Sequence, residues 1–243
     1  MSSGISPSPR FLACGDTAVT IEFGTEIDDD LNTLCLAFDT ALTDAAIPGV
    51  IETLPTYRSV LVQVDPLIVD MAALEARARD ILANLQVNQA QPRRWRVPVV
   101  YGGEFGIDLE DVARTHAITP EEVVRRHSAR VYRVAMLGFL PGFCYLSGAD
   151  QTIALPRRTN PRGKTPAGTI SIGGVQALIA SVEAPSGWHL LGRTPVRSFA
   201  PDRDPVFLFS AGDEVTFEPV PADAWDDLDA RAAAGEPIAE IVS

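Results

Sequence analysis

The chain has 243 residues, of which 46% are hydrophobic and 21% are charged, and its formal net charge is −12. This length and hydrophobic content allow one large core or two smaller ones and argue against a disordered chain. The acidic balance argues against binding to nucleic acid or to an anionic membrane surface, because both need clustered lysines and arginines.

The composition gives no targeting or metal-binding signal. The first ten residues are rich in Ser and Pro and lack the apolar core of a signal peptide, and no apolar run is long enough to cross a bilayer. The three cysteines form no CxxC pair, and the three histidines are far apart in the sequence. These patterns predict a cytoplasmic protein with reduced thiols and no metal site.

The first hundred residues alternate strand and helix patterns. Val19, Ile21 and Phe23 alternate with polar residues, as in a half-buried strand, and an apolar stripe at helical spacing follows over 31–42. The remaining elements are strands over 50–54 and 60–64, a helix over 71–85 and a strand over 95–101. The order βαββαβ predicts a ferredoxin-like α/β domain over residues 1–101.

Residues 102–129 are predicted to form a helical connector. Asp108 is placed to cap a short helix whose apolar residues include Leu109 and Val112. A stronger helix start follows at Thr119–Glu122, with Thr as the N-cap, Pro at the first helical position and Glu at the capping-box position.

Beyond residue 129, short β-rich runs are separated by many Gly and Pro residues, which predicts a closed or strongly bent β-domain over 130–220. The runs lie at 132–136, 170–172, 175–180, 206–209 and 215–217. The tail, 221–243, is acidic and rich in Ala, and it predicts a terminal helix or a loosely held end. The chain as a whole is therefore expected to have an α+β fold.

Two features of the β-rich region could carry chemistry. Leu137–Leu146 gathers three aromatic residues around two glycines and a proline, which fits either a tight barrel corner or an apolar ligand wall. Between Gln151 and Arg203, seven cations stand against two acids, a net charge of +5. Such a basic segment suits a small carboxylate or phosphate, unless its arginines pair with the acidic surface. Gly163-Lys164-Thr165 is not expected to bind nucleotide, because a P-loop's first glycine is missing and a proline follows.

The histidines give weaker signals. His127 can share a helical face with Val123 and Val124, where a packing role competes with a proton-transfer role. His189 follows Trp188, whose ring could line a pocket or fill the barrel. The sequence shows no nucleophile elbow, Cys–His pair or carboxylate pair, so it lacks the signature of a complete hydrolase.

Several groups of residues resemble one known family. Tyr101–Leu109 resembles the family's domain-junction motif and Tyr132–Leu146 its signature. Shorter motifs follow in the family's order: Pro156-Arg157-Arg158, Pro161-Arg162, Pro166-Ala167-Gly168, Gln176, Trp188 and Gly192-Arg193-Thr194-Pro195. On these residues the chain is identified as a member of the 5-oxoprolinase B-subunit (PxpB) family, also called the allophanate hydrolase subunit 1 or KipI-like family.

The resemblance implies a small N-terminal α/β domain followed by a cyclophilin-like β-barrel. It also implies a subunit that is inactive alone and acts in an ATP-dependent complex that opens 5-oxo-L-proline to L-glutamate. The implied partners are a second cyclophilin-like chain, the KipA-like C subunit, and a LamB/YcsF-like A subunit. ATP would be a co-substrate of the complex, with its site on this chain or on a partner chain.

The implied substrate is a small lactam carboxylate, which suits aromatic walls and arginines. The candidate catalytic residues are His127, for proton transfer, and Arg193, for stabilising negative charge. The candidate substrate-binding residues are Phe139, Pro141, Phe143, Tyr145, Arg157, Arg162, Gln176, Trp188 and Thr194.

The chain departs from the family pattern at three places. Cys144 stands where the signature usually has Pro, Ser171 replaces a usual Gly, and residues 177–180 differ from a Thr-Gly-Ile-Tyr-like run. These changes leave two alternative functions open. One is a KipI-like inhibitor of a histidine kinase, and the other is a component of an allophanate hydrolase or carboxyltransferase-type complex that acts on another small amide.

Overall fold

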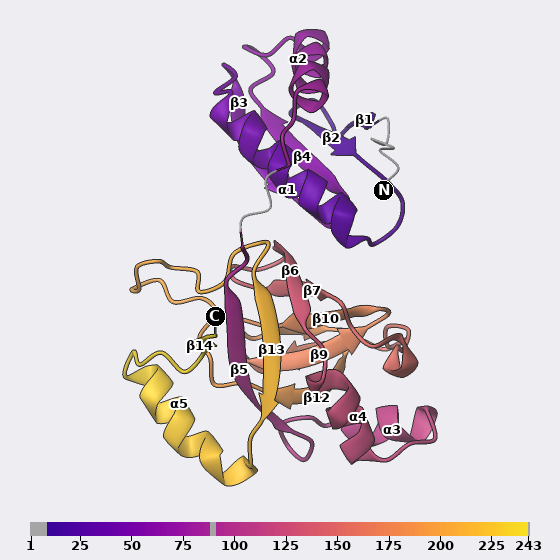
Figure 1. Cartoon of the computed structure of the whole chain (residues 1–243), viewed down its shortest axis with the longest axis vertical. Coiled ribbons are helices and arrows are strands. Elements are labelled where there is room, and N and C mark those ends of the chain that lie inside the picture. The colour runs from indigo at the N-terminus through magenta and orange to yellow at the C-terminus, as the bar shows by residue number, and fades with distance from the viewer. Residues whose placement is uncertain (1–8, 88–90, 243) are drawn as a thin grey trace. The chain divides into compact units, whose positions relative to one another are not determined.

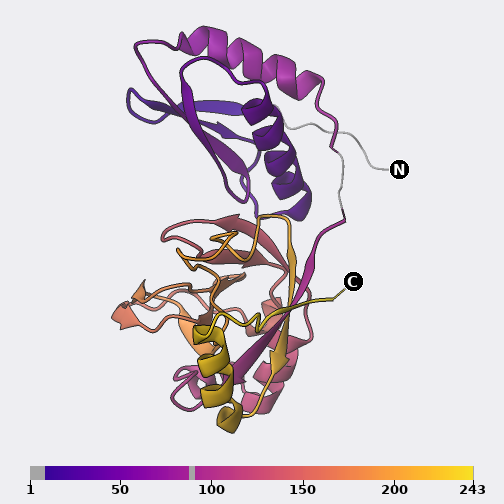
Figure 2. The same ribbon diagram turned by 90° about the vertical axis from the view of Figure 1, so that its left-hand side faces the viewer.

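The computed structural model describes residues 9–87 and 91–242. The chain forms two compact units, Met1–Gln91 and Pro92–Ser243. Each unit has its own sheet and its own hydrophobic core. In Figures 1 and 2, indigo and violet mark the N-terminal unit, and the later colours up to yellow mark the C-terminal unit.

The N-terminal unit has the element order β1-β2-α1-β3-β4-α2 over its described residues. Its four strands form an antiparallel sheet in the order β1-β2-β4-β3. The elements are β1 (Arg10–Ala13), β2 (Ala18–Glu22), α1 (Asp29–Asp44), β3 (Val50–Pro55), β4 (Ser59–Val64) and α2 (Met71–Ala83). The strands and helices predicted up to residue 85 are therefore all present.

This sheet has the strand order of a ferredoxin-like domain, but one of its strands comes from a different part of the chain than predicted. The edge position beside β2, which the prediction assigned to residues 95–101, is occupied by β1. A short turn joins β1 to β2, so a local hairpin fills the position. The residue pattern hardly indicates β1, because Phe11 alone of its four residues is partly buried.

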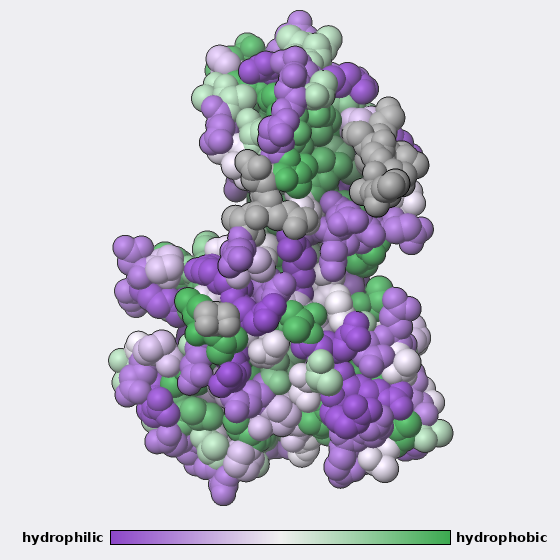
Figure 3. Space-filling view, in the orientation of Figure 1, coloured by the Kyte–Doolittle hydropathy of each residue, from purple (hydrophilic) through white to green (hydrophobic). Residues whose placement is uncertain are grey.

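The two helices cover one face of this sheet. Cys35, Phe38 and Leu42 of α1 belong to one buried cluster with Val60 and Val62 of β4. Burying each of the larger apolar side chains stabilises the unit by about 1.5–3 kcal/mol. On the face viewed in Figure 3, hydrophobic residues form a broad area on this unit, whereas on the other unit hydrophilic residues separate them.

The C-terminal unit is built around a closed barrel of seven strands. The order is β12-β9-β10-β7-β6-β13-β5, and β5 returns to β12. Neighbouring strands are antiparallel except for β5 and β13, which are parallel. The barrel strands are β5 (Arg94–Tyr101), β6 (Tyr132–Leu137), β7 (Cys144–Ser147), β9 (Thr169–Gly173), β10 (Gln176–Ile179), β12 (His189–Arg193) and β13 (Glu214–Pro219).

Further elements surround the barrel. Strands β8 and β11 form a separate two-stranded ribbon, and β14 adds to the outer edge of β5. The elements are α3 (Leu109–Thr115), α4 (Pro120–Ser128), a 3₁₀ turn (Gln151–Ile153), β8 (Arg162–Thr165), β11 (Ala184–Ser186), a second 3₁₀ turn (Ala222–Ala224), α5 (Trp225–Ala233) and β14 (Glu240–Ile241). The predicted α+β fold is confirmed.

The boundary between the units lies earlier than the predicted position at Tyr101. The strand predicted over 95–101 exists as β5, but it pairs with β12, β13 and β14 and not with the N-terminal sheet. Its alternation of buried and exposed residues identifies a strand without identifying the neighbours that complete its hydrogen bonds. Strand β5 therefore belongs to the barrel and not, as predicted, to the N-terminal unit.

The predicted connector and tail are both part of the barrel unit. Val112 of α3 and Val123 of α4 lie in the barrel core. Thr119 caps α4 as predicted, because its Oγ1 accepts a hydrogen bond from Glu122 N at 3.2 Å. The tail is held by β14, which pairs with β5 over Glu240 and Ile241.

The remaining differences concern short strands. Residues 206–209, predicted as a strand, contribute only an isolated bridge between Phe207 and Phe199. Strands β7, β8, β11 and β12 were not predicted, because Gly, Pro and His interrupt the alternation around them. No helix in the described part of the chain combines the length and the apolar character needed to span a membrane. Within residues 9–87 and 91–242, no group of three or more His, Cys, Asp or Glu side chains could hold a metal ion.

Candidate functional site

Three aromatic side chains form a wall on the outside of the barrel. Cys144 and Leu146 of β7 belong to the barrel core, so the alternating Phe143 and Tyr145 face outward. Trp188, which directly precedes β12, joins the same outer cluster. The rings of Tyr145 and Trp188 meet edge to face with their centroids 5.9 Å apart. Phe143, Tyr145 and Trp188 are called the aromatic wall below.

The wall is held in place by a glycine in β9. A Cβ atom added to Gly173 would lie 2.7 Å from Cδ2 of Trp188, which is closer than any real side chain tolerates. The absence of a side chain at this position therefore lets the indole lie directly on the strand backbone. The aromatic residues thus cover the barrel, as the barrel-corner interpretation predicts, and of the three only Tyr145 is half-exposed.

The loop before β7 presents a further aromatic ring. Phe139 is 63% exposed, its φ angle is +71°, and its ring meets that of Phe143 edge to face at 5.6 Å. The loop is closed by a hydrogen bond from Gly138 N to Phe143 O at 3.1 Å. Ser198 Oγ donates to Gly142 O, also at 3.1 Å. A strained backbone that exposes an aromatic ring is typical of a contact with a ligand or partner.

The arginines of the basic segment are mostly engaged within the chain. Arg157 alone among the seven cations makes no hydrogen bond or ion pair with any described residue. The other six are engaged as follows: Arg158 and Arg162 with Asp108, Lys164 with Glu183, Arg197 with Asp229, and Arg193 and Arg203 with backbone carbonyl groups. Arg157 is thus the one cation of the segment whose guanidinium has no partner among the described residues.

Asp108 is the centre of a buried ion-pair network. Its side chain is 2% exposed and lies in an Arg fork, with Arg162 Nη2 at 2.6 Å from Oδ1 and Nη1 at 2.9 Å from Oδ2. Arg158 Nη1 donates to Oδ1 at 3.2 Å, and Leu190 N donates to Oδ2 at 2.8 Å. Asp108 occupies the N-cap position of α3 as predicted, but its side chain makes no capping hydrogen bond to the helix, because the carboxylate is engaged by the arginines. Asp108, Arg158 and Arg162 are called the Asp108 clamp below.

Arg157 lies beside the aromatic wall. Burial raises the pKa of Tyr145, and the positive charge of Arg157 lowers it in part, so the guanidinium and the phenol are within electrostatic reach. The residues on either side of Arg157 are fixed to the barrel. Pro156 O accepts a hydrogen bond from His189 Nε2 at 2.9 Å, and Arg158 N donates to Gly187 O at 2.7 Å. The segment thereby presents one free cation next to an aromatic surface.

Arg193, a predicted catalytic residue, is engaged with the C-terminal helix. Its Nε and Nη2 atoms donate to Ala167 O at 3.2 and 3.0 Å. Its guanidinium lies 4.7 Å from the ring centroid of Trp225 in α5, and burial lowers its pKa from the ordinary value. These contacts favour a role in holding α5 against the barrel.

His127, the other predicted catalytic residue, lies in the barrel core. It is fully buried, Nδ1 is 2.8 Å from Tyr101 Oη, and its ring stacks on Phe217 with the centroids 4.9 Å apart. Nε2 is buried and has no hydrogen-bond partner among the described residues. Burial lowers the pKa of His127 to about 3, so the ring is neutral at ordinary pH. The geometry therefore favours the packing role over proton transfer.

The other three predicted residues, Gln176, Thr194 and Pro141, have different surroundings. Gln176 is half-buried where the β9–β10 hairpin begins its return strand, opposite Gly173. Thr194 is fully buried, and its Oγ1 accepts a hydrogen bond from Val196 N at 3.2 Å. Pro141 is exposed, and its carbonyl oxygen accepts a hydrogen bond from the Ser181 hydroxyl.

The structure thus brings together only part of the predicted site. Phe143, Tyr145 and Trp188 form one surface with Arg157 beside them and Phe139 at its rim. Arg162 serves the Asp108 clamp, and Arg193, Thr194 and His127 lie elsewhere in the unit. Asp108 itself was missed as a site residue, because its partners lie 50 and 54 residues further along the chain. No local pattern signals such a pairing.

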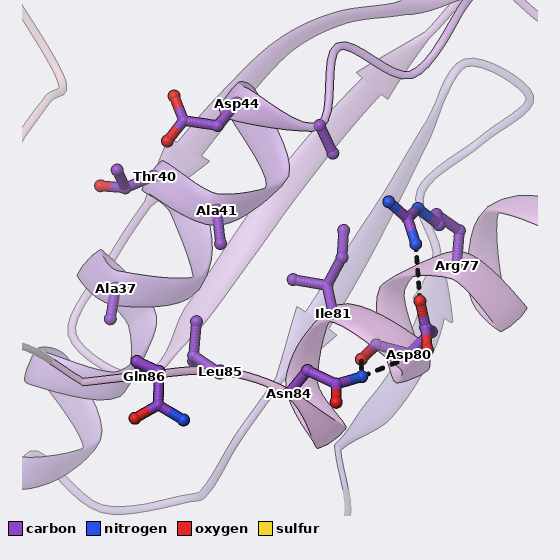
Figure 4. A pocket seen from close by; sticks show the side chains of 11 residues that line it. Ala37, Thr40, Ala41, Asp44, Arg77, Asp80, Ile81, Asn84, Leu85 and Gln86 are labelled. Atoms are coloured by element: carbon purple, nitrogen blue, oxygen red, sulfur yellow. Dashed lines mark hydrogen bonds and ion pairs between the residues drawn. The ribbon is translucent and has the colours of Figure 1, made fainter.

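Cavities in the described part of the chain also lie away from this surface. One of about 590 Å³ lies between α1 and α2, where Ala37, Ala41, Ile81 and Leu85 form the apolar part and Arg77 pairs with Asp80 (Figure 4). A second, of about 650 Å³, lies between α1 and β3. A third, of about 610 Å³, lies between residues 196–208 and the segment that follows α5. None of the predicted site residues lines any of these three cavities.

The Gly163-Lys164-Thr165 sequence does not form a phosphate-binding loop. These residues lie in β8, and no helix follows them directly. Lys164 is exposed and pairs with Glu183, with Nζ at 2.9 Å from Oε2. A P-loop instead needs a glycine-rich turn that leads into a helix N-terminus. These residues therefore do not fit the phosphates of ATP.

A family model for the carboxyltransferase domain, subdomains C and D, matches residues 9–209 of this chain. The barrel with its outer aromatic surface is therefore that of a carboxyltransferase-type domain. Among curated proteins, the B subunit of 5-oxoprolinase from Bacillus subtilis is 38% identical over 84% of this chain and 89% of its own length. The corresponding protein of Escherichia coli O157:H7 is 34% identical over 86% of this chain and 95% of its own. The chain belongs to the 5-oxoprolinase B-subunit family.

Two solved structures share the fold of this chain. The structure of TTHA0988 is 32% identical and superposes with a TM-score of 0.74 over 84% of this chain, which spans 40% of that longer chain. The urea carboxylase of Kluyveromyces lactis superposes with a TM-score of 0.82 over 99% of this chain at 18% identity, and the chain spans 24% of it. At that identity the likeness shows a shared fold alone.

Proposed function

We propose that this chain is the B subunit of a 5-oxoprolinase and takes part in opening 5-oxo-L-proline to L-glutamate. The relatives that bear this name align over 89% and 95% of their own lengths, so the match covers nearly the whole of each relative. The observation that carries the substrate class is the free guanidinium of Arg157 beside the aromatic wall. A small ring that bears one carboxylate is complementary to this pair of features.

The chemistry of the substrate fits this surface in two ways. The carboxylate of 5-oxoproline can accept two hydrogen bonds from the fork of Arg157. The methylene edge of the lactam ring can lie against the half-exposed ring of Tyr145, which packs against the buried Trp188. Phe139 would close the rim of the site, since its exposed ring lies next to Phe143.

We place the other parts of the reaction outside this surface. ATP is assigned to a partner chain, since Lys164 lies in a strand and pairs with Glu183. The partners proposed for the complex are a KipA-like C subunit and a LamB/YcsF-like A subunit. His127 and Arg193 are given structural roles, because one is a neutral core residue and the other holds α5.

The test is glutamate release from 5-oxoproline and ATP by this chain combined with its KipA-like and LamB/YcsF-like partners. Each chain is omitted in turn, and a mixture without ATP serves as a further control. Activity in the complete mixture alone would support the proposal. A stable complex that neither binds 5-oxoproline nor releases glutamate would contradict it and would favour another small amide or a kinase-inhibiting role.

A further inference from the structure

The Asp108 clamp joins three parts of the barrel unit that are distant in the sequence. Asp108 precedes α3, its two arginines lie before and in β8, and Leu190 lies in β12. Both carboxylate oxygens are used: Oδ1 accepts from Arg158 and Arg162, and Oδ2 accepts from Arg162 and from Leu190 N. A buried carboxylate with four donors fixes its partners tightly, because each donor would be costly to leave unpaired.

The clamp also controls the charge around Arg157. Three arginines lie within six residues, at 157, 158 and 162. The carboxylate of Asp108 engages two of them, Arg158 and Arg162, which are 30% and 23% exposed, and its single negative charge offsets one of their two positive charges. Without this carboxylate, all three guanidinium groups would repel one another and compete for the same anions.

The segment that carries Arg157 has further anchors besides the clamp. Gly174 N donates to Leu155 O at 2.6 Å, and Arg158 N donates to Gly187 O at 2.7 Å. These backbone bonds hold the chain on both sides of Arg157, and the clamp adds the only side-chain anchors described for Arg158 and Arg162. The backbone is therefore held on both sides of Arg157, and Asp108 holds the side chains of Arg158 and Arg162 without touching Arg157 itself.

We infer that Asp108 is a positioning residue that keeps Arg158 and Arg162 occupied and so leaves Arg157, in a fixed direction beside Tyr145, as the one guanidinium that receives the substrate carboxylate. This inference rests on the proposed function for the identity of the ligand. The coupling between Asp108 and Arg157 does not depend on the proposed function, because both residues belong to this chain.

The first experiment is a double-mutant cycle in the complete complex. Asp108→Asn should raise KM for 5-oxoproline about tenfold while kcat stays within about twofold. In the Arg157→Ala background the same change should add less than about twofold. Asp108→Glu, which keeps the charge, should recover part of the loss. Asp229→Asn is the matched control, because Asp229 also pairs with an arginine, Arg197, but is not part of the Asp108 clamp.

Equal effects of Asp108→Asn in both backgrounds would overturn the inference, because Asp108 would then support the fold without acting through Arg157. A fall in kcat in proportion to the fraction of folded protein would do the same. If Asp108→Asn does not fold, Arg158→Lys and Arg162→Lys replace it, since each keeps its charge and loses the fork geometry. These two variants should raise KM in the same Arg157-dependent way.

A second experiment works without any activity. The charge of Arg157 influences the ionisation of the Tyr145 phenol, so 3-fluorotyrosine placed at position 145 of the full chain reports on it by fluorine NMR titration. Arg157→Ala should raise the phenol pKa, and Asp108→Asn should change that pKa when Arg157 is present but not in the Arg157→Ala background. An unchanged titration in Asp108→Asn would overturn the inference. If the complex releases no glutamate but this coupling is present, the proposed function fails and the positioning role stands.

Discussion

Two regions of the barrel unit use their polar side chains in opposite ways. Around Arg157, a buried carboxylate occupies two arginines and leaves a third one free beside an aromatic surface. His127 and Arg193 instead have partners within the fold. His127 contacts the Tyr101 hydroxyl in the core, and the Arg193 guanidinium lies over the ring of Trp225 in α5. Whether a polar side chain is already paired within the chain, more than its residue type, therefore decides whether it is available to a ligand.

The largest expected effect comes from removing the free cation. Arg157→Ala should lower kcat/KM for 5-oxoproline in the assembled complex by about 10- to 100-fold, since a hydrogen bond to a charged group contributes about 1.5–3 kcal/mol. Steady-state glutamate release measures this, with Arg197→Ala as the control because Arg197 is already paired with Asp229. Equal losses in both variants would remove the distinction between the two regions.

The next effect concerns the buried imidazole. Because burial lowers the pKa of His127 to about 3 while an unfolded histidine titrates near 6.5, the unfolded state gains a proton first as the pH falls. Stability is therefore complete above about pH 6.5 and is lost towards pH 3, with a limiting slope of about 1.4 kcal/mol per pH unit for one proton.

This pH dependence can be isolated with a variant. His127→Phe with Tyr101→Phe, which also avoids leaving the Tyr101 hydroxyl unpaired, should flatten the slope between pH 6 and 4. Urea unfolding followed by tryptophan fluorescence measures it, because all three tryptophans, at 95, 188 and 225, lie in the barrel unit. A slope as steep as in the unmodified chain would assign the pH dependence to other groups.

A smaller effect is expected at Arg193. Arg193→Ala should destabilise the barrel unit by about 1 kcal/mol, through loss of the contact with Trp225 and of two hydrogen bonds to Ala167 O. Tryptophan fluorescence should report the change directly, since Trp225 is the residue that loses its cation. KM for 5-oxoproline should stay within about twofold, and a large rise in KM with unchanged stability would restore Arg193 to the site.

The smallest effect is expected at the exposed end of the basic segment. Lys164→Ala should change the free energy of unfolding by less than about 0.5 kcal/mol, because its ion pair with Glu183 joins two exposed side chains. Nucleotide binding by the complex should also be unchanged in this variant. Loss of ATP-dependent activity would instead show that β8 contributes to the nucleotide site.

Much of the fold followed from local patterns in the sequence. The apolar stripe of α1, the Thr119 cap of α4 and the strand patterns of β2 and β4 are each decided within a short stretch of chain, and the structure confirms them. The aromatic segment before residue 146 was also recognisable by itself. Family membership followed from the same segment and was confirmed by relatives aligned over nearly their whole length.

Which strands and which charged groups pair with one another was decided by the tertiary structure alone. The alternation of β5 predicts a strand equally well for either sheet, and only the positions of β12, β13 and β14 assign it to the barrel. In the same way, seven cations are equivalent in a sequence count, and only the positions of Asp108, Glu183, Asp229 and several backbone carbonyl groups show which of them are already bound. Pairings across 50 or more residues depend on the whole fold, because no local spacing determines which groups burial brings within hydrogen-bond distance.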